Sequence, residues 1–311
     1  MTFSSKEKNI ARIQALISGI LMGTVGIFVS NLPNSWIAVC ARGLFGFLFI
    51  FLILLFTKNL KIIKVFRNSL VYVILTGLNN VIVISCYFYG ITTVGMGIAA
   101  FLLYTNGIFG LFFMRIFLNE KIKLFKWICF GIAIFGVLII MEPWNSINPI
   151  INNTKIIGYS SSLASGIFLG LDFSIKKKIF KIIRKDQNYL NNYSGKFNIG
   201  LVNIALVLFT TIFLFIFTFP FLYKYILNFN FNQLIISILL GIIPTAIPFA
   251  IFNYSLTKDE GGDIIILTYI EPIVACILGA VFYSELKMST LLGGIFIVLA
   301  NIIILLNDKN N

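Results

Sequence analysis

The sequence contains no histidine and few charged residues. Histidine is absent from all 311 positions, which excludes any mechanism that needs an imidazole base, an imidazole proton relay or a histidine-bound metal. Only 11% of the residues are charged, whereas soluble domains carry about a quarter. Hydrophobic residues make up 59% of the chain, and the mean hydropathy is +0.98. So few charges cannot cover so much apolar surface in water, and the composition predicts an integral membrane protein of the all-α class.

Cysteine is scarce, and the motifs of common enzymes are missing. Four cysteines lie one by one in apolar runs, without CxxC or metal spacing: Cys40, Cys86, Cys129 and Cys276. This placement is typical of small buried hydrophobic residues rather than of a disulfide or zinc framework. HExxH, GxSxG, paired aspartates within a span and an ATP-binding P-loop are also absent. We therefore expect no cofactor, no metal and no enzymatic activity, and an intramembrane enzyme is the weakest functional hypothesis.

Ten apolar runs have the length needed to cross a bilayer. A hydrocarbon core about 30 Å thick needs about 20 helical residues at about 1.5 Å per residue. The predicted spans are Ile13–Ser30, Trp36–Thr57, Ser69–Gly90, Val94–Leu118, Leu124–Met141, Ile157–Ile175, Ile199–Leu222, Leu234–Leu256, Gly262–Tyr283 and Ser289–Leu306. A second span follows the first almost at once, so the first run is predicted to be a retained helix and not a signal peptide.

The basic residues predict an orientation. A net charge of +13 could indicate a nucleic-acid partner, but the 24 Lys and Arg residues lie between the apolar runs. With the N-terminus inside, the outer loops hold only Lys155, Lys224 and Lys287, Arg42 lies within a span, and the other basic residues are cytoplasmic. Positive residues near short loops stay in the cytoplasm. We expect a multi-pass protein of the cell (inner) membrane with both termini cytoplasmic, and no nucleic-acid partner.

The two halves of the chain look duplicated. A shift of 165 residues places identical residues on each other: Tyr89 on Tyr254, Tyr104 on Tyr269, and Glu120 on Glu285. Near the start of each half a shift of 147 aligns Gly19 and Gly23 with Gly166 and Gly170. Each half has an odd number of spans, so the second must enter the membrane upside down. The prediction is ten transmembrane helices as two inverted five-helix repeats, residues 1–142 and 156–307, with a basic cytoplasmic loop at 176–198.

Several of the repeated segments match a known family. Gly97–Tyr104 with Leu118–Lys121, and Glu271–Ile273 with Ser284–Leu286 and Gly293–Gly294, resemble the EamA-like family of the drug/metabolite transporter superfamily. The resemblance covers nearly the whole chain. It implies ten helices, cytoplasmic termini, a central cavity between the halves and alternating access. The chain departs from the family pattern at Asn106-Gly107, where the family often has a proline.

Glu271 is the foremost candidate for a functional residue. It lies nine residues into the ninth predicted span, near the bilayer midplane, where a charged group is costly and marks a functional site by default. Pro272 cannot donate to the carbonyl of Thr268, which leaves an acceptor beside the carboxylate. The repeat partners of Glu271 and Pro272 are Asn106 and Gly107. We expect Glu271 to bind substrate, a proton or a cation; the alternative is a structural carboxylate between helices.

Two more charged residues lie in predicted spans. Arg42 follows Trp36 by six residues, so it either attracts a substrate carboxylate or phosphate from the outer side or extends to the outer interface. Asp172 precedes Lys176 by four residues, which predicts an ion pair on one helix face and a structural role.

Uncharged candidates and hinges complete the predicted site. The polar candidates are Asn79, Asn80, Asn253, Tyr87, Tyr104 and Tyr269, whereas Tyr89 and Tyr254 fit an interfacial belt. The hinge candidates are Pro244, Pro248, Pro272 and Gly107. Pro244 and Pro248 are expected to break the eighth span, and Gly77, Asn79 and Asn80 are expected to interrupt the third at similar depth. The paired glycines of the first and sixth spans predict close helix packing.

Two transport hypotheses remain open. The first is a secondary carrier for an amino acid, a related metabolite or a drug, coupled to protons or to a counter-substrate. The second is a flippase for a lipid-linked intermediate, which would need a cavity open to lipid. A channel would need a continuous polar stripe, and the polar sites are isolated. The expected partners are a small-molecule substrate, protons or a counter-substrate, and membrane lipid, with the protein a monomer or a homodimer.

Overall fold

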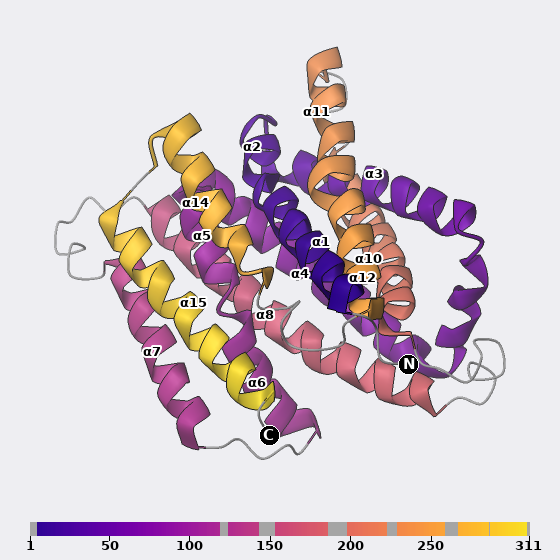
Figure 1. Ribbon diagram of the computed structural model, residues 1–311. Coiled ribbons are helices and arrows are strands. Elements are labelled where there is room, and N and C mark those ends of the chain that lie inside the picture. The colour runs from indigo at the N-terminus through magenta and orange to yellow at the C-terminus, as the bar shows by residue number, and fades with distance from the viewer. Residues whose placement is uncertain are drawn as a thin grey trace.

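The computed structural model describes residues 5–118, 124–142, 153–185, 198–222, 229–258, 267–285 and 287–309, and every element in these ranges is helical (Figure 1). The elements are α1 (Ser5–Gly23), α2 (Val25–Ser30), α3 (Ser35–Phe56), η1 (Leu60–Ser69), α4 (Leu70–Val94), α5 (Met96–Leu103), α6 (Asn106–Leu118), α7 (Leu124–Met141), α8 (Asn153–Arg184), α10 (Ile199–Leu222), α11 (Phe231–Gly241), η4 (Ile242–Ala246), α12 (Ile247–Lys258), α14 (Ile270–Tyr283) and α15 (Met288–Lys309). The predicted all-α class is confirmed.

The helices have the length and surface of membrane spans. Among the described residues, seven helical segments are long and apolar enough to cross a bilayer, and three shorter apolar helices lie at Trp127–Met141, Ile270–Tyr283 and Met288–Ile303. Large apolar side chains face outward, such as Phe56, Val281 and Phe282 with 80%, 69% and 62% of their surface exposed. In lipid such side chains are in their preferred solvent, and helices satisfy their own backbone groups. The chain is a multi-pass helical membrane protein.

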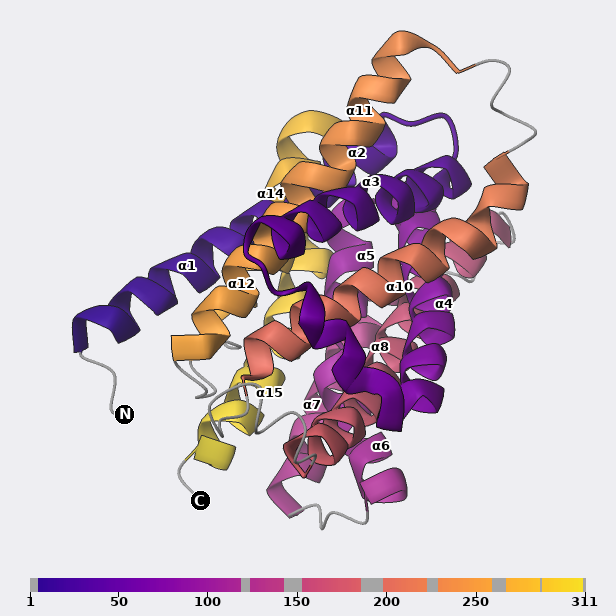
Figure 2. The same cartoon turned by 90° about the vertical axis from the view of Figure 1, so that its right-hand side faces the viewer.

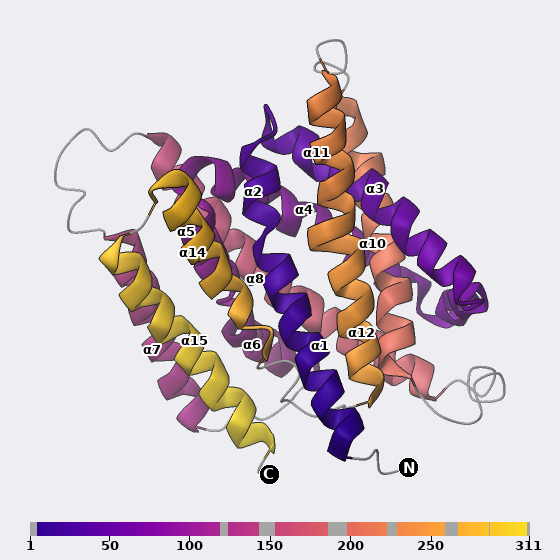
Figure 3. The same cartoon turned by 45° about the horizontal axis from the view of Figure 1, so that its top comes forward.

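Helices that are distant in sequence pack together. α7 and α15 run side by side (Figure 1), and α3 lies along α10 (Figure 2). α1 packs between α12 and α14 (Figure 3), while α4 and α8 form the most extensive pair. The start of α1 and the end of α15 lie at the same end of the bundle (Figure 3). The two halves of the chain are therefore interleaved.

The paired glycines allow two reciprocal close contacts. A Cβ atom at Gly23 of α1 would lie 2.8 Å from the carbonyl oxygen of Glu271, and one at Gly170 of α8 would lie 2.8 Å from that of Asn106. Both distances are too short for a real side chain, so only glycine lets the backbones approach this closely. The predicted close packing of the small-residue pairs is confirmed. Gly23 of the first half thus contacts Glu271 of the second half. Gly170 of the second half contacts Asn106, the repeat partner of Glu271, in the first half.

Two turns lie at matching places in the two halves. α5 ends at Leu103 and α6 begins at Asn106, with a turn at Tyr104 and Thr105. In the second half of the chain a turn at Thr268 and Tyr269 precedes α14. Tyr104 and Tyr269 therefore lie in these two turns.

Three expectations about helix continuity are wrong. α4 is unbroken from Leu70 to Val94, so Gly77, Asn79 and Asn80 do not interrupt it. The eighth predicted span does not break at Pro244 or Pro248, because it continues through the π-helical turn η4. There the Thr245 hydroxyl donates to the carbonyl of Leu240 at 2.9 Å, which occupies an acceptor that the wider turn leaves available.

The third correction concerns the basic segment. α8 continues as a helix to Arg184, so the first part of the predicted loop at 176–198 is the end of a helix. Residues 186–197 lie outside the described ranges. The lysines that begin at Lys176 mark the end of the apolar run, but the helix itself continues to Arg184.

Candidate functional site

Glu271 meets Tyr104 where the two turns come together. The Tyr104 hydroxyl lies 2.7 Å from Oε2 of Glu271 and 3.1 Å from the carbonyl oxygen of Thr268. Its single proton is thus shared between two acceptors. The carbonyl of Thr268 is the acceptor that Pro272 was expected to leave available, and it also accepts the backbone N–H of Glu271 at 3.0 Å. A tyrosine from the first half therefore binds both the carboxylate and the backbone of the second.

Tyr269 and Asn301 surround this contact. The rings of Tyr104 and Tyr269 meet edge to face, with centroids 5.1 Å apart. The Asn301 side chain, from α15, donates to the carbonyl of Tyr104 at 2.8 Å and to that of Ile297 at 2.9 Å. A Cβ atom at Gly107 would collide with Oδ1 of Asn301 and lie 3.2 Å from the Tyr269 hydroxyl. Gly107 thus provides the space that Asn301 and Tyr269 occupy.

Sequence analysis did not identify Asn301. It lies in the last apolar run without a charged or proline neighbour to draw attention to it. The one available signal was a buried amide in the middle of a membrane helix, which needs a partner. Asn106, the repeat partner of Glu271, is 5% exposed and begins α6. Its backbone carbonyl, and not its side chain, lies against Gly170 of α8.

Arg42 is buried inside the bundle. Only 9% of its surface is exposed, and its guanidinium lies over the ring of Phe88, 5.5 Å from the centroid. It interacts electrostatically with Glu271 and Tyr87. Within the described part of the chain no carboxylate oxygen lies within 4.0 Å of its nitrogens. The alternative that Arg42 extends to the outer interface is therefore wrong.

Tyr87 lies on the same side of the cluster. Its side chain is 2% exposed, and its hydroxyl has no hydrogen-bond partner among the described residues. It interacts electrostatically with both Glu271 and Arg42. Arg42, Tyr87, Tyr104 and Glu271 therefore bring α3, α4, the α5–α6 turn and α14 to one place; we call these four residues the central cluster.

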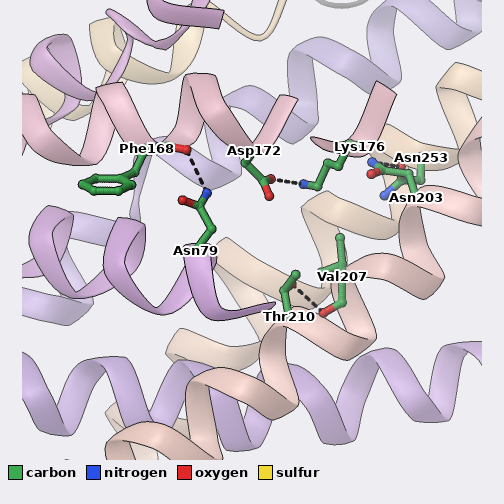
Figure 4. A network of polar contacts seen from close by, with 8 residues as sticks. All are labelled: Asn79, Phe168, Asp172, Lys176, Asn203, Val207, Thr210 and Asn253. Carbon is green, nitrogen blue, oxygen red and sulfur yellow. Dashed lines mark hydrogen bonds and ion pairs between the residues drawn. The ribbon is translucent and has the colours of Figure 1, made fainter. Parts of the chain in front are cut away.

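A second polar cluster lies between α4, α8, α10 and α12 (Figure 4). The predicted ion pair is confirmed: Nζ of Lys176 lies 2.7 Å from Oδ2 of Asp172, which is 2% exposed. Asn79 donates from α4 to the carbonyl of Phe168 in α8 at 2.8 Å. The two helices are thus joined by a polar contact beside the ion pair (Figure 4).

Asn253 is also in this second cluster and not in the central one. Its Oδ1 accepts from Asn203 of α10 at 2.7 Å, and its amide donates to the carbonyl of Phe249 at 2.7 Å. Asn80 is half-buried, next to Asn79 on α4. Tyr254, expected in an interfacial belt, is 51% exposed, while Tyr89 is half-buried. The structure thus brings Glu271, Tyr104, Tyr269 and Arg42 together and places Asn79 and Asn253 elsewhere.

A third polar contact joins α5 to the connection between α14 and α15. Oε2 of Glu285 accepts the backbone N–H of Met96 at 2.9 Å. The preceding residue is Gly95, with φ of +98°, a conformation that favours glycine. Burial raises the pKa of the Glu285 carboxyl, and the bond from Met96 offsets part of that effect. Glu120, its partner in the repeat alignment, lies outside the described residues.

This arrangement defines a class of protein. A multi-pass helical bundle that holds opposite charges in its interior, beside the α5–α6 turn, has the features of a membrane transporter. Comparison with known proteins then identifies the family. The model of the EamA-like transporter family matches residues 9–142 and 192–306. The chain therefore belongs to the EamA-like transporter family, within the drug/metabolite transporter superfamily.

Individual relatives agree with this assignment. An "Uncharacterized transporter" of Archaeoglobus fulgidus is 24% identical over 285 residues, which cover 91% of this chain and 92% of the relative. An "Uncharacterized transporter" of Clostridium kluyveri is 23% identical over 250 residues, which cover 79% and 76%. A solved structure titled only "Crystal structure of protein" matches with a TM-score of 0.59 and 12% identity, over 95% of this chain and 96% of that one. At this identity the structural likeness shows the fold alone.

Proposed function

We propose that the protein is a secondary active transporter that moves a small organic solute, such as an amino acid, a related metabolite or a drug, by alternating access. The observation that carries this proposal is the contact of Tyr104 with Glu271, which brings the α5–α6 turn against the start of α14. Transporters with repeated halves hold their substrate and coupling ion at such points. The family and the names of the relatives support the same class of function.

The proposed architecture is ten transmembrane helices in two inverted five-helix repeats. It is supported by the reciprocal contacts of Gly23 with Glu271 and of Gly170 with Asn106. A rotation that exchanges the halves would exchange these two contacts. The family model also matches the chain in two ranges, 9–142 and 192–306. The charge asymmetry of the loops supports cytoplasmic termini in the cell membrane.

The contact between Tyr104 and Glu271 suggests how the two halves could move. Tyr104 belongs to the first half, and its hydroxyl contacts both Glu271 and Thr268 of the second half. Rocking of one half against the other changes this contact directly. A proton or a solute that binds Glu271 competes with Tyr104 for the carboxylate, and this competition would couple binding to movement. Such competition supports the proposed coupling to protons or to a counter-substrate.

A transport assay with purified protein tests the proposal. Ligands that raise the thermal stability of the detergent-solubilised protein are first selected from amino acids, nucleosides and cationic drugs. Each selected compound is then measured, radiolabelled, in counterflow into proteoliposomes. Saturable counterflow that is absent from protein-free vesicles is the expected result. If every stabilising compound equilibrates equally in both kinds of vesicle while a lipid-linked intermediate changes leaflet, the flippase alternative replaces the carrier.

A further inference from the structure

The connection between α3 and α4 carries a row of three cations. η1 is a 3-10 helix, in which a turn takes about three residues and rises about 6 Å. Lys61, Lys64 and Arg67 follow one another at intervals of three residues, and side chains at this interval lie directly in line along a 3-10 helix. All three side chains are exposed. η1 therefore presents one continuous positive edge.

The other side of η1 is apolar and holds it against the bundle. Ile62 and Phe66 are buried, and they belong to one apolar cluster with Ile179 and Ile183 of α8 and with Val202 of α10. A short helix with an apolar side and a basic side has the pattern of a segment that lies at a membrane surface. The packing fixes where η1 presents its cations.

A second row of cations runs along the end of α8. Lys178, Lys181 and Lys185 are three and four residues apart, an interval that places them on one side of a helix, and Lys185 directly follows the last residue of α8. Nζ of Lys178 lies 4.9 Å from the ring centroid of Tyr72, in the first turn of α4. Because α4 begins directly after η1, this contact brings the second row to the junction of η1 and α4.

The protein supplies little negative charge at this junction. We call the six cations of the two rows the basic surface. Residues 57–75 and 175–185 contain no aspartate or glutamate. Within the described ranges, no carboxylate oxygen lies within 4.0 Å of a cation of the basic surface, whereas Lys176, further back on α8, is paired with Asp172. Like charges gathered in this way attract a partner that carries several negative charges.

Exposed apolar side chains border the basic surface on both sides. Phe56 is the last residue of α3, and Leu70 and Val71 begin α4; all three are exposed. Side chains of this kind lie among acyl chains in a bilayer, whereas lysine and arginine extend to the headgroup layer. The basic surface therefore lies at the depth of the lipid phosphates.

We propose that the basic surface binds anionic phospholipids. Their phosphates contact the cations of η1 and α8, and their acyl chains lie along the exposed side chains at the end of α3 and the start of α4. A soluble polyanion would contact the cations but not the apolar border, so the two features together favour lipid. This surface shares no residue with the central cluster, and the proposal does not depend on the transported solute.

A lipid titration tests the proposal on the purified wild-type protein. Thermal stability in a neutral detergent is measured against dioleoylphosphatidylglycerol and against dioleoylphosphatidylcholine. Saturable stabilisation by phosphatidylglycerol alone is expected, and it should weaken as the salt concentration rises from about 0.1 M to about 0.5 M. The soluble headgroup analogue sn-glycerol 3-phosphate should not reproduce the effect, because it has no acyl chains.

A triple substitution removes the row on η1. Lys61→Gln, Lys64→Gln and Arg67→Gln together should lower the apparent affinity for phosphatidylglycerol about tenfold or more, because each cation near an anionic surface adds to binding. These side chains are exposed, so the thermal midpoint in phosphatidylcholine should stay close to that of the wild type. Lys178→Gln with Lys181→Gln should also weaken binding, and this pair tests the surface if the triple variant does not fold.

Two further variants separate position from charge. The control variant loses three exposed lysines outside the basic surface, through Lys8→Gln, Lys155→Gln and Lys287→Gln. It has the same net charge as the η1 triple variant and should bind phosphatidylglycerol like the wild type. The swap of Lys61→Arg, Lys64→Arg and Arg67→Lys keeps the charge of the row and should keep the affinity.

Three results would overturn the proposal. One is equal stabilisation of the wild type by the two phospholipids. Another is a triple variant that binds phosphatidylglycerol as tightly as the wild type, or a control or swap variant that loses as much affinity as the triple variant. The third is stabilisation by sn-glycerol 3-phosphate that equals that of the lipid, which would assign the surface to a soluble anion.

Discussion

Two pairs of opposite charges lie inside the bundle, and they are held in different ways. Asp172 and Lys176 are in contact at 2.7 Å on one face of α8. Arg42 and Glu271 come from α3 and α14, interact electrostatically and do not touch. The touching pair neutralises its own charges, although Oδ1 of Asp172 has no hydrogen-bond partner among the described residues. A separated pair keeps more of the cost of burying its charges, so it is the better candidate for a binding site.

The supporting residues differ in the same way. Beside Asp172, Asn79 and Phe168 link α4 to α8 within a contact that is continuous along both helices. Beside Glu271, Tyr104 contacts the carboxylate at a turn between two helices. The first region is built on continuous stretches of α4 and α8, and the second on the α5–α6 turn and the start of α14. We therefore expect substitutions in the first to change stability and substitutions in the second to change transport.

The largest expected effect on transport comes from Glu271→Gln. Loss of one partner of a buried charge pair costs about 2–5 kcal/mol, so uptake into proteoliposomes should fall by about 30-fold or more. Glutamine can still accept from Tyr104, so the folded amount of protein should stay close to that of the wild type. Dependence of transport on pH should disappear as well if Glu271 carries the proton. Wild-type uptake by this variant would remove Glu271 from the site.

The largest expected effect on stability comes from Asp172→Asn. The substitution leaves Lys176 without its counter-charge, and Lys176 is 19% exposed and can turn partly toward water. We expect a loss of about 1–3 kcal/mol of stability, seen as a lower midpoint of thermal unfolding in detergent. The double variant Asp172→Asn with Lys176→Gln should recover part of this loss. A large change in substrate preference, with no change in the midpoint, would reverse the comparison.

Tyr104→Phe should have an intermediate effect. The ring contact with Tyr269 is kept, while the hydrogen bond to Glu271 is lost, at a cost of about 1.5–3 kcal/mol for a charged acceptor. Because this bond joins the two halves, transport rates should change several-fold while substrate preference stays the same. Single-turnover counterflow measures the rate. An unchanged rate would show that the contact does not control the movement of the halves.

The smallest expected effect comes from Glu285→Gln. Burial raises the pKa of Glu285, so the ionised carboxylate costs stability in the folded protein. This cost is absent when the pH is below the ordinary glutamate pKa of about 4.3. It is fully present when the pH is above the raised pKa of the folded protein. Glutamine keeps an acceptor for the N–H of Met96, so the variant should be as stable as the wild type at neutral pH or slightly more stable.

Two measurements complete the test at Glu285. The difference between Glu285→Gln and wild type should vanish near pH 4. Glu285→Leu leaves the N–H of Met96 unpaired and should lose about 1 kcal/mol at any pH. Thermal unfolding across a pH series measures both variants. Lower stability of the glutamine variant at neutral pH would show that the charge itself is needed at this contact.

Local patterns in the sequence predicted the features that depend on neighbours along the chain. The spacing of Asp172 and Lys176 places both on one helix face, and the ion pair is present. The spacing of Gly19 and Gly23, and of Gly166 and Gly170, predicted close packing, which the structure confirms. The apolar runs predicted where helices lie, because bilayer thickness sets their length.

Features that depend on tertiary packing could not be predicted. Sequence placed Asn79 and Asn253 among the substrate candidates, yet each is bonded to a neighbouring helix in the second cluster. The burial of Arg42 over Phe88 depends on how α3 crosses α4, and Asn301 reaches Tyr104 only because α15 packs near the α5–α6 turn. Gly77 and Pro244 were expected to interrupt their helices. Instead α4 continues through Gly77, and a π-helical turn accommodates Pro244.

Chemical protection of Glu271 tests the central claim most directly, namely that a transported solute or a proton competes with Tyr104 for this carboxylate. Purified protein is treated with a hydrophobic carbodiimide, which modifies protonated carboxyl groups, and modification is followed by mass spectrometry with Glu285 as the internal control. A transported solute should slow modification of Glu271 and leave that of Glu285 unchanged. Modification of Glu271 at one rate with and without a transported solute would contradict the account.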